Sequence, residues 1–238
     1  MGKVKQILII GCSVSLRVRP PESQSLKNLN YGKIIENELN KSEGDALWVV
    51  KNKGISRAIT RDVLLMKDEF GRNQANYVIL NIGAVDAPNR EIPLWFSDVL
   101  HYKRRQSFYK LFNFLNHYLI KGKMRSKLVL LRGKRSWTSK NKFTKDIHEI
   151  IDSIKKDSPS KIIVLGINSG NKRIEQILPG TMEKYKEYNL ILKQISMEKK
   201  CSFIDVSDLE SDKYFPDGVH YNQLGHGMVS KRLLQQIK

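Results

Sequence analysis

Ser13 is a candidate nucleophile because it follows a short apolar run that ends in glycine. The run Ile7–Ile10 leads into Gly11-Cys12-Ser13, and a sharp turn after a buried strand can expose a serine hydroxyl beside backbone N–H groups. A serine hydroxyl attacks a carbonyl only when a base removes its proton. The alternative for Ser13 is a helix N-cap, a frequent role of serine after a strand. Ser15 is a second candidate nucleophile.

Asp217 and His220 have the spacing of a carboxylate and the base that it orients. A carboxylate three residues before a histidine can accept a hydrogen bond from the ring Nδ1–H, which fixes the tautomer and stabilises the imidazolium formed when Nε2 takes a proton. The alternative is a plain turn, because Pro216-Asp217-Gly218 is a favourable turn sequence. His226 is a rival base. With Ser13, these residues predict a Ser-His-Asp triad.

The elements that must position these residues are short apolar runs alternating with helical patterns. Five runs rich in β-branched residues or leucine predict buried strands: Gln6–Ile10, Ala46–Val50, Tyr77–Ile82, Ile162–Ile167 and Ser202–Val206. A shorter run, Leu128–Leu131, is similar. Apolar residues recur at helical spacing in 30–40, 107–119, 147–154, 188–195 and from Asn222. This alternation predicts an α/β fold, a three-layer α/β/α sandwich around a mostly parallel five-stranded sheet.

The chemistry-bearing residues fall where predicted strands end. Ser13 follows the first strand, Gly54 the second and Gly83–Asp86 the third, and Asp217 and His220 lie after the fifth. In open α/β sheets, ligands bind at the carboxyl ends of the strands. We therefore expect these residues to meet at one rim.

Four blocks, in order along nearly the whole chain, resemble the SGNH (GDSL-like) hydrolase family. They are Ile9–Val14, Asn52–Gly54, Leu80–Asp86 and Asp217–His226. The resemblance implies a flavodoxin-like SGNH hydrolase fold in a single domain, 1–238, and a serine esterase that uses no metal and no cofactor. The last block is the most specific, and it selects His220 rather than His226 as the base.

The resemblance also implies an oxyanion hole made by the backbone N–H groups of Ser13 and Gly54. Val85 stands where the family usually has an asparagine whose side-chain N–H would bind the oxyanion. Losing one such donor costs roughly 10²–10³ in rate. Either the two backbone groups suffice, or Asn81 or Arg90 substitutes, or the enzyme is slow.

Polar residues near the strand ends are candidates for substrate binding. Arg17, Arg57 and Arg90 could bind a carboxylate, phosphate or sulfate through a bidentate fork, although exposed loop arginines are an equal alternative. Asp86 is expected beside the substrate. The segment Gly83–Arg90 resembles SGNH proteins of bacterial polysaccharide biosynthesis clusters. The resemblance thus implies an acyl ester, in particular an acetyl ester, of a carbohydrate or glycolipid as substrate.

Two other functions remain open. An acyltransferase would use the same triad but move the acyl group onto a polysaccharide precursor instead of water. A non-catalytic glycan-binding relative with a weakened oxyanion hole is favoured by Val85 and by Cys12, which replaces the usual aspartate. The intact Ser13, Asp217 and His220 argue against it.

The chain is strongly basic, with 42 lysines and arginines, 24 aspartates and glutamates and a net charge of +18. Such a balance attracts polyanions, although solvated helix faces are the alternative explanation. The densest basic run is Lys121, Lys123, Arg125, Lys127, Arg132, Lys134 and Arg135. No zinc-finger, RNP or P-loop spacing occurs, so nucleic acid is not an expected partner. An acidic or lipid-linked glycan is expected, peripheral contact with an anionic membrane is left open, and the oligomeric state is not predicted.

Cysteine content and hydropathy predict a soluble, cytoplasmic protein. Cys12 and Cys201 are too few for a disulfide framework, although a nucleophilic Cys12 is an alternative to a buried thiol. The apolar run Ile7–Ile10 is shorter than the roughly 7–15 residues of a signal-peptide core. No stretch approaches the roughly 20 apolar residues of a membrane helix.

Overall fold

The computed structural model describes residues 3–16, 18–19, 28–41, 46–72, 74–102, 114, 117 and 124–237. Within these residues, parallel strands form one five-stranded sheet in the order β2-β1-β3-β4-β5. The strands are β1 (Lys3–Cys12), β2 (Ala46–Ile55), β3 (Tyr77–Asn81), β4 (Lys161–Leu165) and β5 (Ser202–Ile204). All five predicted strands are therefore confirmed, although β4 and β5 each end two residues earlier than predicted and β1 and β2 are longer.

The order of the strands places a crevice between β1 and β3. From β1 the chain first adds β2 on one side and then β3, β4 and β5 on the other. Such a reversal is a topological switch point, and ligands bind there beyond the carboxyl ends of the strands. Ser13 follows β1 and Gly83 lies two residues after β3, so both lie at this crevice.

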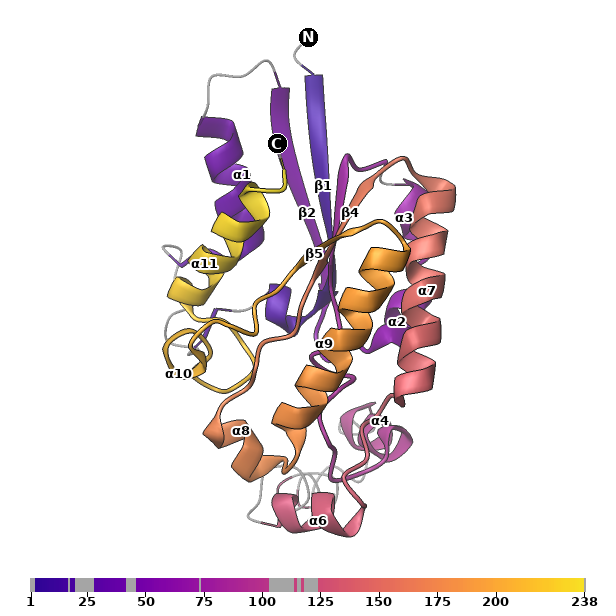
Figure 1. The fold of residues 1–238 in the computed structure, drawn as a ribbon, viewed down its shortest axis with the longest axis vertical. Coiled ribbons are helices and arrows are strands. Elements are labelled where there is room, and N and C mark those ends of the chain that lie inside the picture. The colour runs from indigo at the N-terminus through magenta and orange to yellow at the C-terminus, as the bar shows by residue number, and fades with distance from the viewer. Residues whose placement is uncertain are drawn as a thin grey trace.

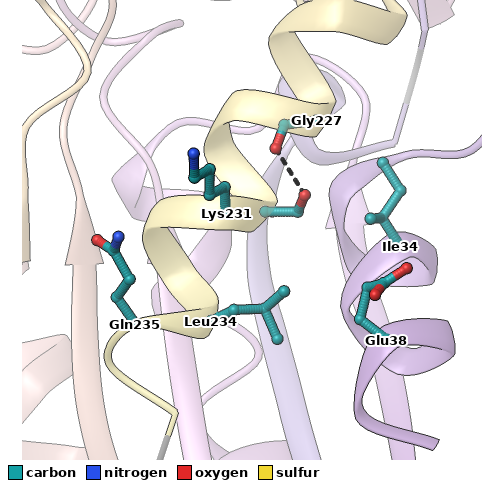
Figure 2. A pocket seen from close by; sticks show the side chains of 7 residues that line it. Ile34, Glu38, Gly227, Lys231, Leu234 and Gln235 are labelled. Carbon is teal, nitrogen blue, oxygen red and sulfur yellow. Dashed lines mark hydrogen bonds between the residues drawn. The ribbon is translucent and has the colours of Figure 1, made fainter. Parts of the chain in front are cut away.

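Helices cover both faces of the sheet, which confirms the predicted three-layer arrangement (Figure 1). On one face, α1 (Tyr31–Lys41) packs against α11 (Gln223–Leu234). A groove of about 500 Å³ runs between these two helices, lined by side chains that include Ile34 and Leu234 (Figure 2). On the other face lie α2 (Thr60–Leu64), α3 (Asp68–Arg72), α7 (Lys140–Asp157) and α9 (Thr181–Glu198).

Shorter helices complete the described chain. They are α4 (Leu94–Tyr102), α6 (Arg125–Leu131), α8 (Lys172–Ile177) and α10 (Ser211–Tyr214). Helices α4, α6 and α8 lie together at one end of the molecule, opposite the N-terminus of β1 (Figure 1). Among the described residues, no helix has the length and apolar character needed to cross a membrane.

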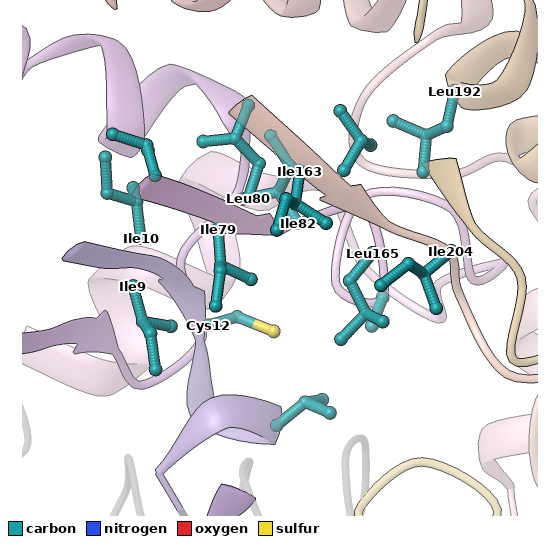
Figure 3. Close-up of a cluster of buried hydrophobic side chains, with 14 of the residues drawn as sticks. Ile9, Ile10, Cys12, Ile79, Leu80, Ile82, Ile163, Leu165, Leu192 and Ile204 are labelled. Atoms are coloured by element: carbon teal, nitrogen blue, oxygen red, sulfur yellow. The ribbon is translucent and has the colours of Figure 1, made fainter. Parts of the chain in front are cut away.

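The core lies between the sheet and its helices. Ile9, Ile79 and Ile163 come from adjacent strands and are at most 1% exposed, and Leu192 of α9 packs against the same cluster (Figure 3). A strand covered on both faces must be apolar at successive positions. This explains why the buried strands appear in the sequence as continuous apolar runs.

The prediction that groups Leu128–Leu131 with the strands is wrong, because these residues form the end of α6. Leucine favours helices, and a glycine closes this one: Gly133 has φ +70° and donates to the carbonyl of Leu130, while Lys134 donates to that of Val129. These two bonds are those of a Schellman cap. The predicted helix over 107–119 lies, except for residues 114 and 117, outside the described residues.

Candidate active site

Ser13 begins a tight turn directly after β1. The 3₁₀ segment η1 (Ser13–Ser15) follows Cys12, whose backbone is still extended. Ser15 is fully buried and its hydroxyl donates to the carbonyl of Cys12 at 2.9 Å, so this second candidate serine is held inside the turn. Ser13 is 7% exposed and its hydroxyl contacts a histidine instead of capping a helix.

The three predicted triad residues lie in hydrogen-bonding contact. Ser13 Oγ lies 2.8 Å from His220 Nε2, and His220 Nδ1 lies 2.8 Å from Asp217 Oδ2. An ionised carboxylate only accepts hydrogen bonds, so Nδ1 carries the proton and Nε2 is left to accept from Ser13. This is the arrangement in which a histidine can remove a proton from a serine.

The loop before α11 fixes both residues of the Asp217–His220 pair. Asp217 Oδ1 accepts from the backbone N–H groups of Val219 at 2.9 Å and His220 at 2.7 Å. Asn168, in the loop after β4, donates to the carbonyl of Val219 at 2.7 Å. Asn222 caps α11 by accepting from the N–H of Gly225 at 2.9 Å. Hydrogen bonds therefore hold the chain on both sides of His220.

The Asp217 carboxyl is stabilised in its ionised form. Burial alone would raise its pKa, but the hydrogen bond from the His220 ring, the charge of that ring and the two backbone N–H groups together lower it to about 2. Arg19 Nε lies 3.8 Å from Asp217 Oδ2 and adds a further positive charge. Asp217 is thus an anion at any pH at which an esterase works.

His226, the rival base, belongs to the core. It is 0% exposed, and its Nδ1 accepts from the backbone N–H of Tyr31 at 3.1 Å. Its ring packs against those of Tyr31 and Tyr221. His226 therefore links α11 to the start of α1, while His220 faces Ser13.

Gly54 departs from the expected oxyanion geometry. It still belongs to β2, opposite Gly11 in β1, and its N–H donates to the side chain of Asn52 at 3.1 Å. A Cβ at Gly54 would lie 2.4 Å from Ser15 Oγ. In this structure glycine at 54 allows the turn to approach β2 closely.

Asn52 is a positioning residue that sequence reasoning missed. Its Nδ2 donates to the carbonyl of Ser15 at 2.8 Å, and its Oδ1 accepts from Gly54 N–H and lies 3.2 Å from Ser15 Oγ. It thereby holds the Ser13 turn against β2. The only signal for this role in the sequence is its place in the second block, two residues before the glycine.

The two residues considered as substitutes for the missing oxyanion asparagine each make a hydrogen bond within the protein, although the Arg90 Nε–H has no partner among the described residues. Val85 is 7% exposed and has no side-chain donor. Asn81 donates to the Tyr31 hydroxyl at 3.0 Å, and Arg90 donates to the carbonyl of Val85 at 2.9 Å. Cys12 is fully buried, and burial raises the pKa of its thiol to about 11, which disfavours a nucleophilic thiolate.

Arg57 and Arg90 gather around one tryptophan. The guanidinium carbon of Arg90 lies 4.1 Å from the centre of the Trp137 ring and that of Arg57 lies 5.5 Å from it. Arg57 also donates to Ser97 Oγ at 2.6 Å. Burial lowers the pKa of Arg90 to about 10, so its guanidinium remains cationic near neutral pH. Arg17 lies outside the described residues.

Asp86 does not lie at the surface of the site, contrary to the expectation that it binds substrate. It is 0% exposed. Its Oδ1 accepts from the N–H and hydroxyl of Thr60 and from the hydroxyl of Thr138, at 2.9, 3.0 and 2.7 Å. The carboxyl joins the segment after β3 to α2 and to the residues before α7, a structural role.

Across the described part of the chain, no group of three or more His, Cys, Asp or Glu side chains could hold a metal ion.

Known proteins share both the sequence profile and the fold of this chain. The profile of the GDSL-like Lipase/Acylhydrolase family matches residues 23–228, a range that begins after Ser13. No curated protein matches the chain in sequence. Solved structures with the same fold include the lipase/acylhydrolase from Enterococcus faecalis, with 14% identity over 98% of this chain and 95% of that one and a TM-score of 0.65.

Two acetyl xylan esterases share the fold as well. AlAXEase has 15% identity over 98% of this chain and all of its own, with a TM-score of 0.64. Axe2 from Geobacillus stearothermophilus has 19% identity over 99% of this chain and 95% of its own, also with a TM-score of 0.64. At such identities the likeness concerns the fold.

The five-stranded parallel sheet with helices on both faces matches the fold of solved SGNH hydrolase structures. Because the family profile covers most of the sequence, the chain belongs to the GDSL-like lipase/acylhydrolase family. It is a serine ester hydrolase of that family.

Proposed function

We propose that this protein removes acyl groups, in particular acetyl groups, from esters of a carbohydrate or glycolipid, with Ser13, His220 and Asp217 as its catalytic triad. The observation that carries the proposal is the continuous contact from Ser13 Oγ through His220 to Asp217, with both distances at 2.8 Å. Such a chain of contacts is the requirement for activating a serine near neutral pH.

The reaction follows from the geometry. Ser13 Oγ attacks the ester carbonyl carbon while its proton passes to His220 Nε2, and Asp217 stabilises the imidazolium. The tetrahedral intermediate collapses when His220 returns that proton to the leaving sugar oxygen, and an acyl-serine remains. Water then gives a proton to His220 while its oxygen attacks the acyl carbon. His220 returns that proton to Ser13 Oγ as the bond to the acyl group breaks, which releases the acid and regenerates Ser13.

Stabilisation of the oxyanion is assigned to the backbone N–H of Ser13. Gly54 N–H would join it only if substrate binding broke its bond to Asn52. With Val85 in place of the usual asparagine, the hole has fewer donors than in typical relatives. We therefore propose a turnover lower by about 10²–10³ than that of an enzyme with the asparagine.

The substrate class rests on three supports. The chain belongs to the GDSL-like lipase/acylhydrolase family, two proteins of the same fold are named acetyl xylan esterases, and the segment Gly83–Arg90 resembles SGNH proteins of polysaccharide biosynthesis clusters. Arg57 and Arg90 add a cationic patch at Trp137. That patch suits an anionic glycan or a lipid-linked glycan phosphate. The single domain over 1–238 and the cytoplasmic location remain predictions.

The test is the release of acetate from p-nitrophenyl acetate and from acetylated xylo-oligosaccharides. Wild type is expected to hydrolyse both substrates, and Ser13→Ala and His220→Ala are expected to lose essentially all of this activity. His148→Ala is the matched control, because His148 lies on α7 and contacts Glu198 rather than the triad. It should retain wild-type rates.

The outcomes separate the competing functions. Equal activity in wild type and Ser13→Ala would contradict the proposal. If wild type releases no acetate but acetylates Ser13 from an activated ester and passes the acetyl group to an added sugar, the protein is an acyltransferase using the same triad. If Ser13 never becomes acetylated, the protein is a non-catalytic glycan-binding relative.

A further inference from the structure

Helix α6 exposes two adjacent leucines to solvent. Leu131 is 83% exposed and Leu130 is 53% exposed, and Met124 just before the helix is 50% exposed. Lys127 on the helix and Lys134 and Arg135 directly after it are exposed as well. We call Lys127, Leu130, Leu131, Lys134 and Arg135 the α6 face.

The opposite side of α6 is firmly anchored. Val129 is fully buried against Ile174 and Leu178 of the α8 region. Arg125 forms an ion pair with Glu91, with Nε and Oε2 3.2 Å apart. Arg132 adds a second anchor, since its Nη1 donates to the carbonyls of Arg90 and Ile92, at 3.0 and 2.9 Å. With both ends and the inner side held, the α6 face is presented outward by the structure.

The cap of α6 fixes the direction of the basic residues. Gly133 and Lys134 both have positive φ, +70° and +53°, and their N–H groups bond back to the last turn of the helix. This closure ends the helix, and Lys134 and Arg135 follow Leu131 after two residues. Exposed leucines and exposed basic residues therefore lie within a short stretch of the chain, 127–135.

The sequence around α6 has an extreme charge. Residues 99–145 contain fourteen lysines and arginines and no aspartate or glutamate, while the whole chain has 24 acidic residues. The positive charge of the protein is thus concentrated in the part of the chain that contains the α6 face. A partner at this face must be anionic.

The exposed leucines near the lysines distinguish between two kinds of anionic partner, a soluble acidic glycan and an anionic bilayer. A soluble acidic glycan would satisfy the cations, but it offers nothing apolar to the leucines. An anionic bilayer offers both, since apolar side chains enter the boundary between headgroups and acyl chains while lysine and arginine bind lipid phosphates. We propose that the α6 face docks this protein on an anionic lipid surface, with Leu130 and Leu131 entering the lipid and Lys127, Lys134 and Arg135 binding phosphates.

The buried side of α6 and the loop that carries His220 share one apolar cluster. Val219 packs against the same small cluster as Val129, and the next residue is His220. A membrane that holds α6 would thus be linked through this cluster to the loop of the proposed base.

The test is flotation of the full chain with unilamellar vesicles, either phosphatidylcholine alone or phosphatidylcholine mixed with phosphatidylglycerol. Wild type should bind the mixed vesicles and bind phosphatidylcholine at least about tenfold more weakly. Leu130→Ser/Leu131→Ser should reduce partition to the mixed vesicles about tenfold or more. Lys134→Gln/Arg135→Gln should reduce it by a similar factor and should flatten its dependence on salt.

The matched control is Leu65→Ser/Leu190→Ser, which makes the same chemical change at leucines that are 80% and 68% exposed elsewhere. It should partition like wild type, and thermal melts should show that every variant is folded. Binding by Leu130→Ser/Leu131→Ser equal to wild type would overturn the proposal and indicate a soluble polyanion. Absence of wild-type binding to the mixed vesicles would also overturn it. Flotation requires no turnover and can be measured with Ser13→Ala, so the result stands apart from the esterase proposal.

Discussion

At the scale of single residues, the proposed catalysis depends on how Asp217 and His220 share one loop. The two Asp217 oxygens have separate roles, since Oδ1 accepts from two backbone N–H groups and Oδ2 faces the His220 ring. The spacing of three residues, visible in the sequence, makes this possible, because it lets one carboxylate bind both the backbone and the side chain of the same histidine. The choice of the histidine that faces Ser13 depended on the whole block, since His226 also lies near the start of the last helix.

Asp217→Asn should abolish most of the activity while leaving the fold intact. An amide at this place no longer fixes the tautomer or stabilises the imidazolium, and in a well-studied serine protease the equivalent change costs about 10⁴ in kcat. The pKa of Asp217 is lowered from 3.8 to about 2, so its carboxylate stabilises the fold above about pH 4. That stability is lost as pH falls toward 2.

Two measurements check this prediction. Steady-state kinetics on p-nitrophenyl acetate should show the fall in kcat, and acid unfolding followed by circular dichroism should be shallower for Asp217→Asn between about pH 4 and pH 2. Asp157→Asn, at the exposed end of α7, is the control for a lost surface charge. Wild-type kcat in Asp217→Asn would contradict the role given to the carboxylate.

Val85→Asn tests whether the weakened oxyanion hole limits the rate. The variant places an amide donor where the resemblance to SGNH hydrolases implies one, and we expect kcat to rise by about tenfold or more. Val85 is 7% exposed, so a polar side chain should also lower the free energy of unfolding by about 1–3 kcal/mol. Val85→Thr, which has no amide, should show the stability loss without the gain. An unchanged kcat in a folded Val85→Asn would show that the oxyanion is bound elsewhere.

At the scale of elements, the turn after β1 is the part that sequence reasoning described least well. The strand could be predicted from its apolar run, and Ser13 could be selected as a candidate only in combination with Asp217 and His220, because a serine after a strand is often a helix N-cap. The contact between the turn and Asn52 of β2 could not, since it depends on the register that places Gly11 opposite Gly54. That register is set by sheet pairing and leaves no local signal.

Asn52→Ala should impair catalysis through Ser13 without touching substrate. The variant loses the bonds to Ser15 and Gly54, and a misplaced nucleophile can cost about 10² in rate. We expect kcat to fall about ten- to a hundredfold with KM little changed. Asn40→Ala is the control, because Asn40 makes two similar bonds to the backbone of Trp48 at the far end of β2. A comparable fall in both variants would indicate lost stability only.

A buried carboxyl gives the sheet-to-helix contact a pH dependence. The Thr60 hydroxyl lies 3.0 Å from Asp86 Oδ1 and 2.7 Å from Asp146 Oδ2. A hydroxyl donates only one hydrogen, so it can donate to only one of these two carboxyl groups at a time. Burial, opposed by hydrogen bonds from Thr60 and Thr138 and helped by the Asp146 charge, raises the pKa of Asp86 to about 6. The folded protein therefore holds this proton more tightly than the unfolded chain, in which the pKa is near 3.8.

Asp86 should consequently weaken the fold as pH rises from about 4 to 6, because the group loses its proton later in the folded state. Asp86→Asn cannot titrate and should remove this part of the pH dependence. Urea unfolding at several pH values in this range checks the prediction. A wild-type slope retained in a folded Asp86→Asn would assign the effect to another group.

At the scale of the whole molecule, the layered architecture could be predicted because strand-helix alternation leaves few solutions. The order of the strands in the sheet could not be predicted from the apolar runs and is known from the structure. The prediction that groups Leu128–Leu131 with the strands is wrong because four apolar residues fit a buried strand or a helix equally well. Only the cap at Gly133 distinguishes the two. The net charge of +18 can be counted in the sequence. That two leucines are exposed near basic residues on α6 can be seen only in the structure.

The central claim is that Ser13 is the nucleophile, and covalent labelling tests it most directly. Folded wild type is treated with a fluorophosphonate, and the labelled peptide is identified by mass spectrometry. We predict a single adduct on the Ser13 hydroxyl, absent from Ser13→Ala and strongly slowed in His220→Ala, because the Ser13 Oγ that attacks phosphorus is activated by the base 2.8 Å away. Labelling of another residue, or no labelling of folded wild type, would contradict the claim.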